Sequence, residues 1–261
     1  MSQHTPHNVK IVDQHTRQAE GYARLTQGMI AGDRRAGLRA LLGLTADDEV
    51  LDVACGPGSL ALDLAPHVAR ATGYDITPAM LDQARAAQAR LGVTNVEWVL
   101  GDAKGLPFPD DSFSVVGSSA AFHHFEQPRF VLAEMKRVCR HGGRVVVLDV
   151  TPEPGKTEAY DRMEHLRDPS HGHAHSIVEF EAMGRAVGLL DPVTQTDLTG
   201  PMPYAAVLDT SFPEACSRDA LLRLMREDAE GGEDRLGFRA AMDGATVTVR
   251  YPMSMIAWIK R

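Results

Sequence analysis

Three aspartates are associated with short apolar runs in the first half of the chain. Asp52 lies inside the first run, Asp75 ends the second, and Asp102 follows the third. In an open α/β sheet, ligands bind beyond the carboxyl ends of the strands. A buried carboxylate without a partner is costly, so an acid in such a place usually has a binding role. The three acids suit a ligand with a cationic amino-acid end near Asp52, a ribose at Asp75 and an adenine amine at Asp102. The alternative for each is an ordinary cap or turn.

A glycine turn joins the first apolar run to a stretch that is compatible with a helix. Gly56, Gly58 and Ala61 fit the Gly-x-Gly-x-x-Ala form of the dinucleotide-binding fingerprint. Glycine permits a sharp turn and a close approach of a ligand to the backbone. The free N–H groups of the following helix favour polar or anionic ligand atoms. A tight turn without a ligand is the other interpretation.

Histidines between residues 123 and 175 supply candidate bases, because an unperturbed imidazole titrates near pH 6.5. We take His124 and His171 as candidate catalytic residues, and His123, His165 and Arg167 as candidate substrate contacts. Packing is the alternative for one of His123 and His124, and Arg167 could instead pair with Asp168. The histidines that we consider as bases are His123, His124, His165, His171, His173 and His175.

The spacing of His171, His173 and His175 raises the question of a metal site. In an extended segment alternate residues share one face, so the three imidazoles could bind one ion. Histidines in loops are commonly solvated, and the three cysteines of the chain are widely spaced. We therefore expect no metal.

Alternating strand and helix patterns between residues 46 and 150 must position these side chains. Apolar strands that alternate with helices indicate a parallel sheet covered on both faces. We predict a single domain in which residues 1–45 form a helical lid, residues 46–150 bind the cofactor, and residues 151–261 supply an acceptor-side cap and the last strands.

The two ends of the chain carry weaker patterns. Residues 1–15 are polar, and we expect them to be frayed. Residues 245–259 contain two strand-like stretches separated by Pro252, which we interpret as a terminal hairpin.

Composition limits the classes of partner. The formal net charge of −8 over 261 residues argues against non-specific binding of nucleic acid. No apolar run is long enough to cross a membrane, and the polar start has no signal-peptide pattern. We expect a cytoplasmic protein, monomeric or homodimeric, with a small-molecule substrate and no nucleic-acid or membrane partner.

The motifs taken together resemble the class I S-adenosylmethionine-dependent methyltransferases, in the ubiquinone/menaquinone-biosynthesis-like (type 11) branch. The similarity covers residues 46–150 closely, with motifs at 50–58, 73–81, 101–113, 118–125 and 134–143. A narrower similarity to one subgroup extends through residues 167–171. The resemblance implies a Rossmann-like sheet of seven mostly parallel strands with helices on both faces and an antiparallel last strand. It also implies S-adenosylmethionine as the methyl donor, with S-adenosylhomocysteine as the product.

The resemblance also implies positions for the cofactor. Asp75 is expected to hold the ribose, and Tyr22 matches an N-terminal aromatic that closes over the cofactor. The residues expected to bind the cofactor are Tyr22, Asp52, Ala54, Gly56, Gly58, Asp75, Ile76, Met80, Gly101, Asp102, Ala103, Ser119 and Ala120.

Methyl transfer to a small molecule, such as an aromatic or other secondary metabolite, is the leading interpretation. A nicotinamide-dependent oxidoreductase on a related fold is the second, because the glycine fingerprint also fits NAD. The third interpretation is a non-catalytic regulatory protein that binds the cofactor.

Overall fold

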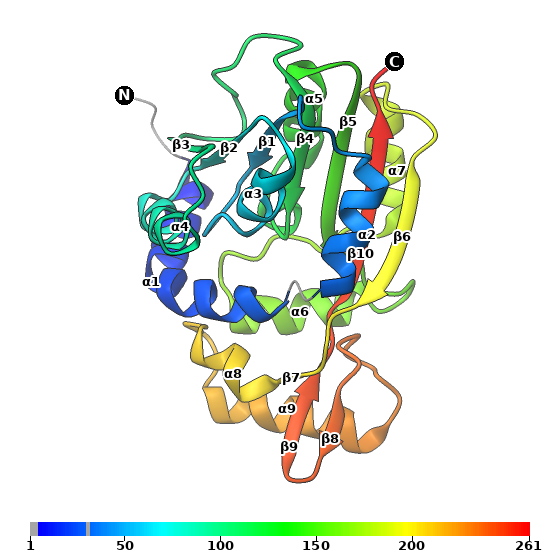
Figure 1. Ribbon diagram of the computed structural model, residues 1–261. Coiled ribbons are helices and arrows are strands. Elements are labelled where there is room, and N and C mark those ends of the chain that lie inside the picture. Colours follow the sequence, from blue (N-terminus) through cyan, green and yellow to red (C-terminus); the bar gives the residue numbers. More distant parts are fainter. Residues whose placement is uncertain (1–4, 30–31) are drawn as a thin grey trace.

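A seven-stranded sheet forms the centre of the molecule (Figure 1). The structure is a computed structural model that describes residues 5–29 and 32–261. The sheet has the order β3-β2-β1-β4-β5-β10-β6, and all its strands except β10 run parallel to one another. This confirms the predicted fold class, including the antiparallel last strand. The strands are β1 (Glu49–Val53), β2 (Arg70–Asp75), β3 (Val96–Leu100), β4 (Phe113–Ser119), β5 (Cys139–Val150), β6 (Val193–Leu198) and β10 (Pro252–Ile259).

Successive apolar residues of the central strands face opposite sides of the sheet, because side chains alternate along a strand. Leu51 and Val116 belong to one core cluster, with side chains of α5 and α7. Val50 and Val115 belong to a second cluster, with side chains of α2 and α3. All four of these residues are at most 1% exposed. Burial on both faces explains why these strands are continuous apolar runs in the sequence.

Helices cover both faces of the sheet, and their ends follow local rules. Pro78 begins α4, and Gly92, with φ 66°, ends it in the left-handed conformation that glycine adopts readily. Ser176 and Glu179 form a capping box at the start of α7. The helices are α1 (Pro6–Met29), α2 (Gly32–Leu42), α3 (Ser59–Leu64), α4 (Pro78–Leu91), α5 (Pro128–Val138), α6 (Thr157–Arg167), α7 (Ile177–Ala186), α8 (Tyr204–Asp209) and α9 (Arg218–Gly231), with the short 3-10 helices η1 (Ala65–His67) and η2 (Phe122–His124).

The expectation of a frayed start is wrong for most of residues 1–15, because α1 begins at Pro6. Ile11 and Ala19 of this helix are buried, and Asn8, Gln14 and Gln18 are buried polar residues. Tertiary contacts of these side chains, which a polar sequence does not reveal, order the helix. Residues 1–4 lie outside the described part of the chain.

The expected hairpin over residues 245–259 is also wrong. Its first stretch, β9 (Thr246–Val249), pairs with β7 (Met202–Pro203) and β8 (Ala241–Asp243) in a separate three-stranded sheet. Its second stretch, β10, pairs with β5 and β6 in the central sheet. The chain passes from one sheet to the other at Arg250 and Tyr251, so the two strands do not pair with each other.

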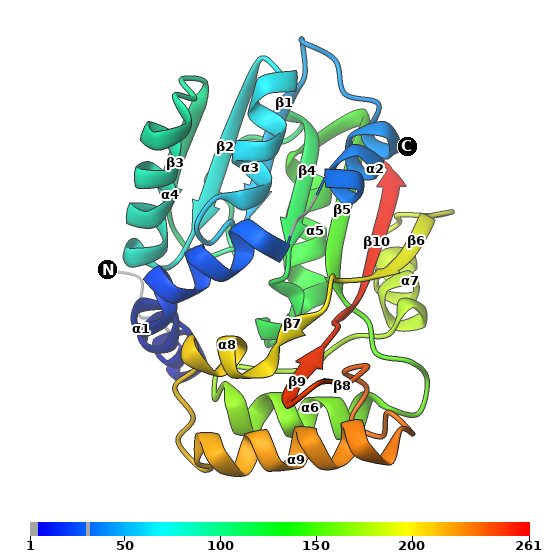
Figure 2. The same ribbon diagram turned by 60° about the horizontal axis from the view of Figure 1, so that its bottom comes forward.

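The small sheet lies with α8 and α9 beyond one end of the central sheet (Figures 1 and 2). Tyr160 of α6 stacks on Phe238 in its core, with ring centroids 4.4 Å apart. Between this unit and the central sheet runs α1 (Figure 2). Within the described residues, the structure contains no helix that is both long and apolar enough to cross a membrane.

Candidate active site

A cavity opens beyond the carboxyl ends of β1 to β4, where the strand order reverses between β1 and β4. Ligands of open α/β sheets bind at such a reversal. Helices α1, α6 and α8 supply the opposite wall. The structure brings fourteen of the eighteen predicted site residues to this cavity: Tyr22, Ala54, Gly56, Asp75, Ile76, Met80, Gly101, Asp102, Ala103, Ser119, Ala120, His123, His124 and Arg167.

A hydrogen bond joins the glycine turn to Asp75. Asp75 accepts a hydrogen bond from the Gly56 amide at Oδ2 and another from the Thr77 amide at Oδ1, both at 2.8 Å. Gly56 has φ 52°, a conformation that is strained for other residues. Burial raises the pKa of Asp75, and the two amide hydrogen bonds oppose that effect. The turn after β1 and the end of β2 therefore form one rigid rim of the cavity.

Two predicted residues of the same turn lie behind the cavity wall. Asp52 is fully buried and accepts a hydrogen bond from the Ala61 amide at 3.0 Å. Burial, with a smaller contribution from Asp75, raises the pKa of Asp52 to about 8. A Cβ on Gly58 would lie 2.3 Å from the Trp98 ring. In this structure the lack of a Cβ at Gly58 therefore leaves space for the Trp98 indole. The Asp52 carboxylate fixes the start of α3 through its hydrogen bond from the Ala61 amide.

Two non-glycine residues with positive φ occupy equivalent places after β1 and β4. Ala54 has φ 54° and Ala120 has φ 52°. Both line the cavity. Left-handed backbone is costly for an alanine and clusters at functional sites. The chain thus turns sharply at both strands that flank the reversal point.

Helix α1 closes over the third aspartate. Asp102 accepts a hydrogen bond from the Asn8 side chain at 2.7 Å and another from the Lys104 amide at 3.0 Å. Tyr22 lines the cavity further along the same helix. Burial, together with the charge of Asp149, raises the pKa of Tyr22 to about 12, so its hydroxyl stays protonated. Asn8 had no recognisable signal in the sequence.

A histidine and an aspartate form a buried pair at the acceptor end of the cavity. His123 Nδ1 lies 2.6 Å from Asp149 Oδ1. The amides of Ala121, Phe122 and Val150 also donate to this carboxylate. Burial opposes the charged imidazole, but Asp149 raises the pKa of His123 overall. Asp149 was not among the predicted site residues, although its position near the end of β5 was a usable signal.

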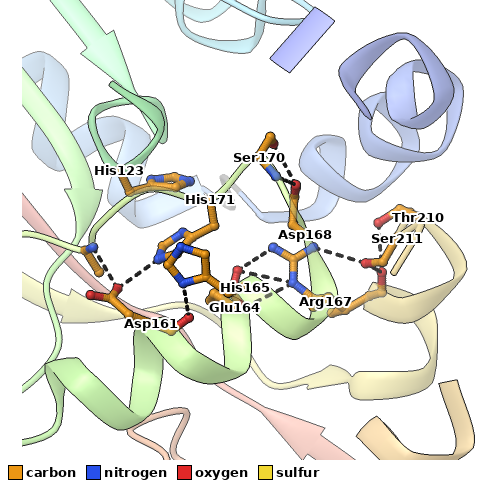
Figure 3. Close-up of polar contacts among 12 residues, drawn as sticks. His123, Asp161, Glu164, His165, Arg167, Asp168, Ser170, His171, Thr210 and Ser211 are labelled. Atoms are coloured by element: carbon orange, nitrogen blue, oxygen red, sulfur yellow. Dashed lines mark hydrogen bonds and ion pairs between the residues drawn. The ribbon is translucent and has the colours of Figure 1, made fainter. Parts of the chain in front are cut away.

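The other predicted histidines are placed differently. His124 lines the cavity, and its Nδ1 donates to the Ser170 carbonyl at 2.9 Å. Burial, with the charge of His123, lowers the pKa of His124 well below its usual value. His171 is buried outside the cavity lining, with Nε2 2.8 Å from Asp161 Oδ1. His165 is exposed and bonds to the Asp161 carbonyl (Figure 3).

Arg167 extends across the cavity wall between Glu164 and Ser211 (Figure 3). It pairs with both oxygens of Glu164, and its Nη1 donates to Ser211 at 3.0 Å. Asp168, which we considered as its partner, instead accepts hydrogen bonds from Gln18 at 3.0 Å and from the Ser170 hydroxyl at 2.6 Å. Glu164, Arg167 and Asp168 all line the cavity. Sequence reasoning did not assign Glu164 or Gln18 to the site, although Glu164 lies three residues before Arg167 on the same helix and Gln18 begins the pattern that ends at Tyr22.

Comparison with known proteins adds independent support for the fold. A family described as a methyltransferase domain matches residues 51–147. YcgJ of Bacillus subtilis, described as an uncharacterized methyltransferase, is 39% identical over 140 residues, which cover 53% of this chain and 55% of YcgJ. The crystal structure of YcgJ matches with a TM-score of 0.75 at 27% identity and covers 87% of this chain and 97% of that structure. Residues 51–147 thus match a methyltransferase domain, and the fold of the chain resembles that of YcgJ.

The methyltransferase domain also has named relatives. The ubiquinone/menaquinone biosynthesis C-methyltransferase UbiE of Roseobacter denitrificans is 35% identical over 134 residues, 49% of this chain and 54% of UbiE. The 27-O-demethylrifamycin SV methyltransferase of Amycolatopsis mediterranei is 32% identical over 173 residues, 64% of this chain and 61% of that enzyme. These matches confirm the resemblance inferred from the motifs. The chain spans little more than half the length of the curated relatives that it matches.

Proposed function

We propose that this protein transfers a methyl group from S-adenosylmethionine to a small-molecule acceptor. The observation that carries the proposal is the cavity itself. It joins the glycine turn, Asp75 and Asp102 on one side to His123 and a buried arginine–glutamate pair on the other. The methyltransferase domain and its relatives support the same reaction class.

In this proposal the cofactor lies along the carboxyl ends of β1 to β3. The free lone pairs of Asp75 accept hydrogen bonds from the ribose hydroxyls, while Ile76 and Met80 contact the adenine. Ala54 and the backbone of Gly56 lie against the methionine part, and Ser119 and Ala120 lie near the sulfonium. The residues present fit this cofactor, because an acidic and partly apolar cavity suits a cationic sulfonium attached to a nucleoside.

The acceptor then occupies the space between η2, α6 and α8. An aromatic or other secondary metabolite is supported by the names of two relatives, which act in quinone biosynthesis and on a rifamycin. Tyr160, Tyr251 and Met253 provide apolar walls there. Arg167 and Glu164 provide polar contacts for substituents of the acceptor.

Alignment and proton removal are the chemical tasks of these residues. Methyl transfer is an in-line displacement in which the bond from sulfur to the methyl carbon breaks as the acceptor's bond to that carbon forms. Holding the two reactants in line makes large effective molarities available. We propose His123 as the base: its Nδ1 proton is held by Asp149, so Nε2 accepts the proton from the acceptor.

Calorimetric titration with S-adenosylhomocysteine tests the cofactor assignment. We expect micromolar binding by the wild-type chain, loss of that binding in Asp75→Ala, and no heat from NAD. Asp82→Ala, which changes an exposed acid of α4, should bind like the wild type. Binding of NAD without binding of S-adenosylhomocysteine would refute the methyltransferase reaction and favour an oxidoreductase. Cofactor binding with no turnover on any acceptor would favour a regulatory protein.

A further inference from the structure

Two histidines and an aspartate from three separate parts of the chain converge in the cavity. They are His15 of α1, His124 of η2 and Asp168, which follows α6. One potential ligand atom of each lies within 4.8 Å of those of the other two. From the sequence we expected no metal, and His15, His124 and Asp168 were not considered together because no spacing pattern links them.

Neighbouring groups orient two of these side chains. Asp168 Oδ1 accepts hydrogen bonds from the Ser170 amide at 2.9 Å and the Ser170 hydroxyl at 2.6 Å, and its Oδ2 accepts from Gln18 at 3.0 Å. His124 donates its Nδ1 proton to the Ser170 carbonyl at 2.9 Å, which leaves the lone pair on Nε2. Outer hydrogen bonds of this kind fix the tautomer and orientation of metal ligands.

His15 has a different environment. Its ring contacts the His124 ring edge-on, with centroids 4.8 Å apart. Within the described part of the chain, the hydrogen bonds found involve neither nitrogen of His15. Arg167, the nearby cation, is engaged by Glu164. Potential ligand atoms of two imidazoles and a carboxylate therefore lie close together, and a cation satisfies such a group better than a further hydrogen-bond acceptor does.

We propose that His15, His124 and Asp168 bind a divalent first-row metal ion, such as Zn²⁺ or Mn²⁺, on the acceptor side of the cavity. Imidazole and carboxylate ligands suit this group of ions. Three protein ligands with open positions are typical of a catalytic site rather than a structural one. Because the ligands line the cavity, the open positions face the space assigned to the acceptor.

The role of the ion rests on the proposed function. A divalent ion held by His15, His124 and Asp168 would act as a Lewis acid toward a hydroxyl oxygen of the acceptor and would lower the pKa of that hydroxyl. His123 would accept the hydroxyl proton, and S-adenosylhomocysteine would leave as the methyl group passes to the oxygen. The acceptor class is therefore a phenol or enol, methylated at oxygen.

A second cluster on the surface offers a matched control. His173, His175 and Glu179 also have potential ligand atoms within 4.8 Å of one another. In this cluster, however, both nitrogens of His173 are already engaged, by Asp161 at 2.6 Å and by Glu179 at 3.1 Å. Glu179 also caps α7. We assign no metal to this cluster.

Metal binding to the chelator-treated chain tests the proposal without any acceptor. We expect calorimetry with Zn²⁺ and with Mn²⁺ to show one site, and Asp168→Asn and His15→Gln each to weaken it by at least about tenfold. His173→Gln should bind as tightly as the wild type. Circular dichroism and thermal unfolding of each variant show whether the fold is retained.

Absence of binding, or loss of binding in His173→Gln alone, would overturn the metal site. The S-adenosylhomocysteine titration is independent of this result. If the cofactor binds and the metal does not, the proposed function stands and the metal site fails. If the metal binds and the cofactor does not, the metal site stands and the proposed function fails.

Discussion

At the scale of residues, the base that we propose is one oriented imidazole, that of His123. Asp149 makes four hydrogen bonds, three with backbone amides and one with His123. A carboxylate held in this way cannot turn away from His123, so the imidazole keeps one tautomer and one direction. This arrangement distinguishes His123 from His124, whose Nδ1 is held by a backbone carbonyl instead.

Replacement of His123 tests its role as the base. With an acceptor found by screening phenols and hydroquinones, we expect His123→Asn to lower kcat by about 10²–10⁴-fold, the usual contribution of a general base. The dissociation constant of S-adenosylhomocysteine should not change, because His123 lies on the acceptor side. Steady-state kinetics and calorimetry measure the two quantities. His165→Asn, at an exposed position outside the cavity, is the control. An unchanged kcat in His123→Asn would exclude this residue as the base.

At the scale of elements, we propose α1 as the part of the cavity wall that opens for ligands. It crosses the carboxyl ends of the strands and bonds to both halves of the site, through Asn8 to Asp102 and through Gln18 to Asp168. His7 also contacts the carbonyl of His124 at 2.7 Å. These polar contacts connect α1 to the walls of the cavity, which is consistent with the lid role that we propose for the N-terminal segment.

Weakening one of these contacts should loosen the lid. A hydrogen bond to a charged group contributes about 1.5–3 kcal/mol. We therefore expect Asn8→Ala to speed the exchange of backbone amides in α1. We also expect it to accelerate release of S-adenosylhomocysteine by up to about tenfold. Hydrogen-exchange mass spectrometry and stopped-flow measurements follow the two effects. Asp13→Ala removes an exposed acid of the same helix and should change neither. Equal exchange in Asn8→Ala and wild type would show that this contact does not hold the lid.

At the scale of the whole molecule, two structurally different units enclose one cavity. The central sheet supplies the cofactor side, and α1, α6 and α8 supply most of the acceptor side. Beyond these helices, the small sheet and α9 have a core of their own around Tyr160 and Phe238. Such a division lets the acceptor pocket vary while the sheet stays the same.

The free energy of unfolding should depend on pH through Asp52. Burial raises its pKa to about 8 in the folded chain, against 3.8 ordinarily, so folding favours the protonated acid. Its contribution to stability is complete below about pH 4 and is lost as the pH rises toward 8. The Asp52→Asn variant has no side-chain proton that titrates in this pH range. Its side-chain amide oxygen can still accept the hydrogen bond from the Ala61 amide.

Urea unfolding at several pH values measures this effect. Between pH 5 and pH 8 we expect the wild type to lose at least about 1 kcal/mol relative to Asp52→Asn, since one pKa unit corresponds to about 1.4 kcal/mol. Asp82→Asn, at an exposed position, should follow the wild type. Parallel curves for wild type and Asp52→Asn would show that Asp52 has an ordinary pKa in the folded chain.

The cofactor-binding half of the molecule could be predicted from the sequence because its signals are local. Apolar runs, a glycine turn and acids at strand ends follow one another within short stretches, so each of β1, β2 and β3 corresponds to an apolar run that the sequence analysis identified. Gly56 and Asp75 were recognisable for the same reason, because a turn with positive φ and an acid at a strand end have local signatures.

The acceptor half was decided by contacts between distant residues. The contacts of His123 with Asp149, of Arg167 with Ser211 and of Asn8 with Asp102 depend on where separate elements come to lie. The same holds for β9 and β10, which are adjacent in the chain and join different sheets. A local pattern can specify a strand or a turn, but it does not contain the partner of a side chain. Partners are selected when all elements pack together, because only the complete core determines which surfaces meet.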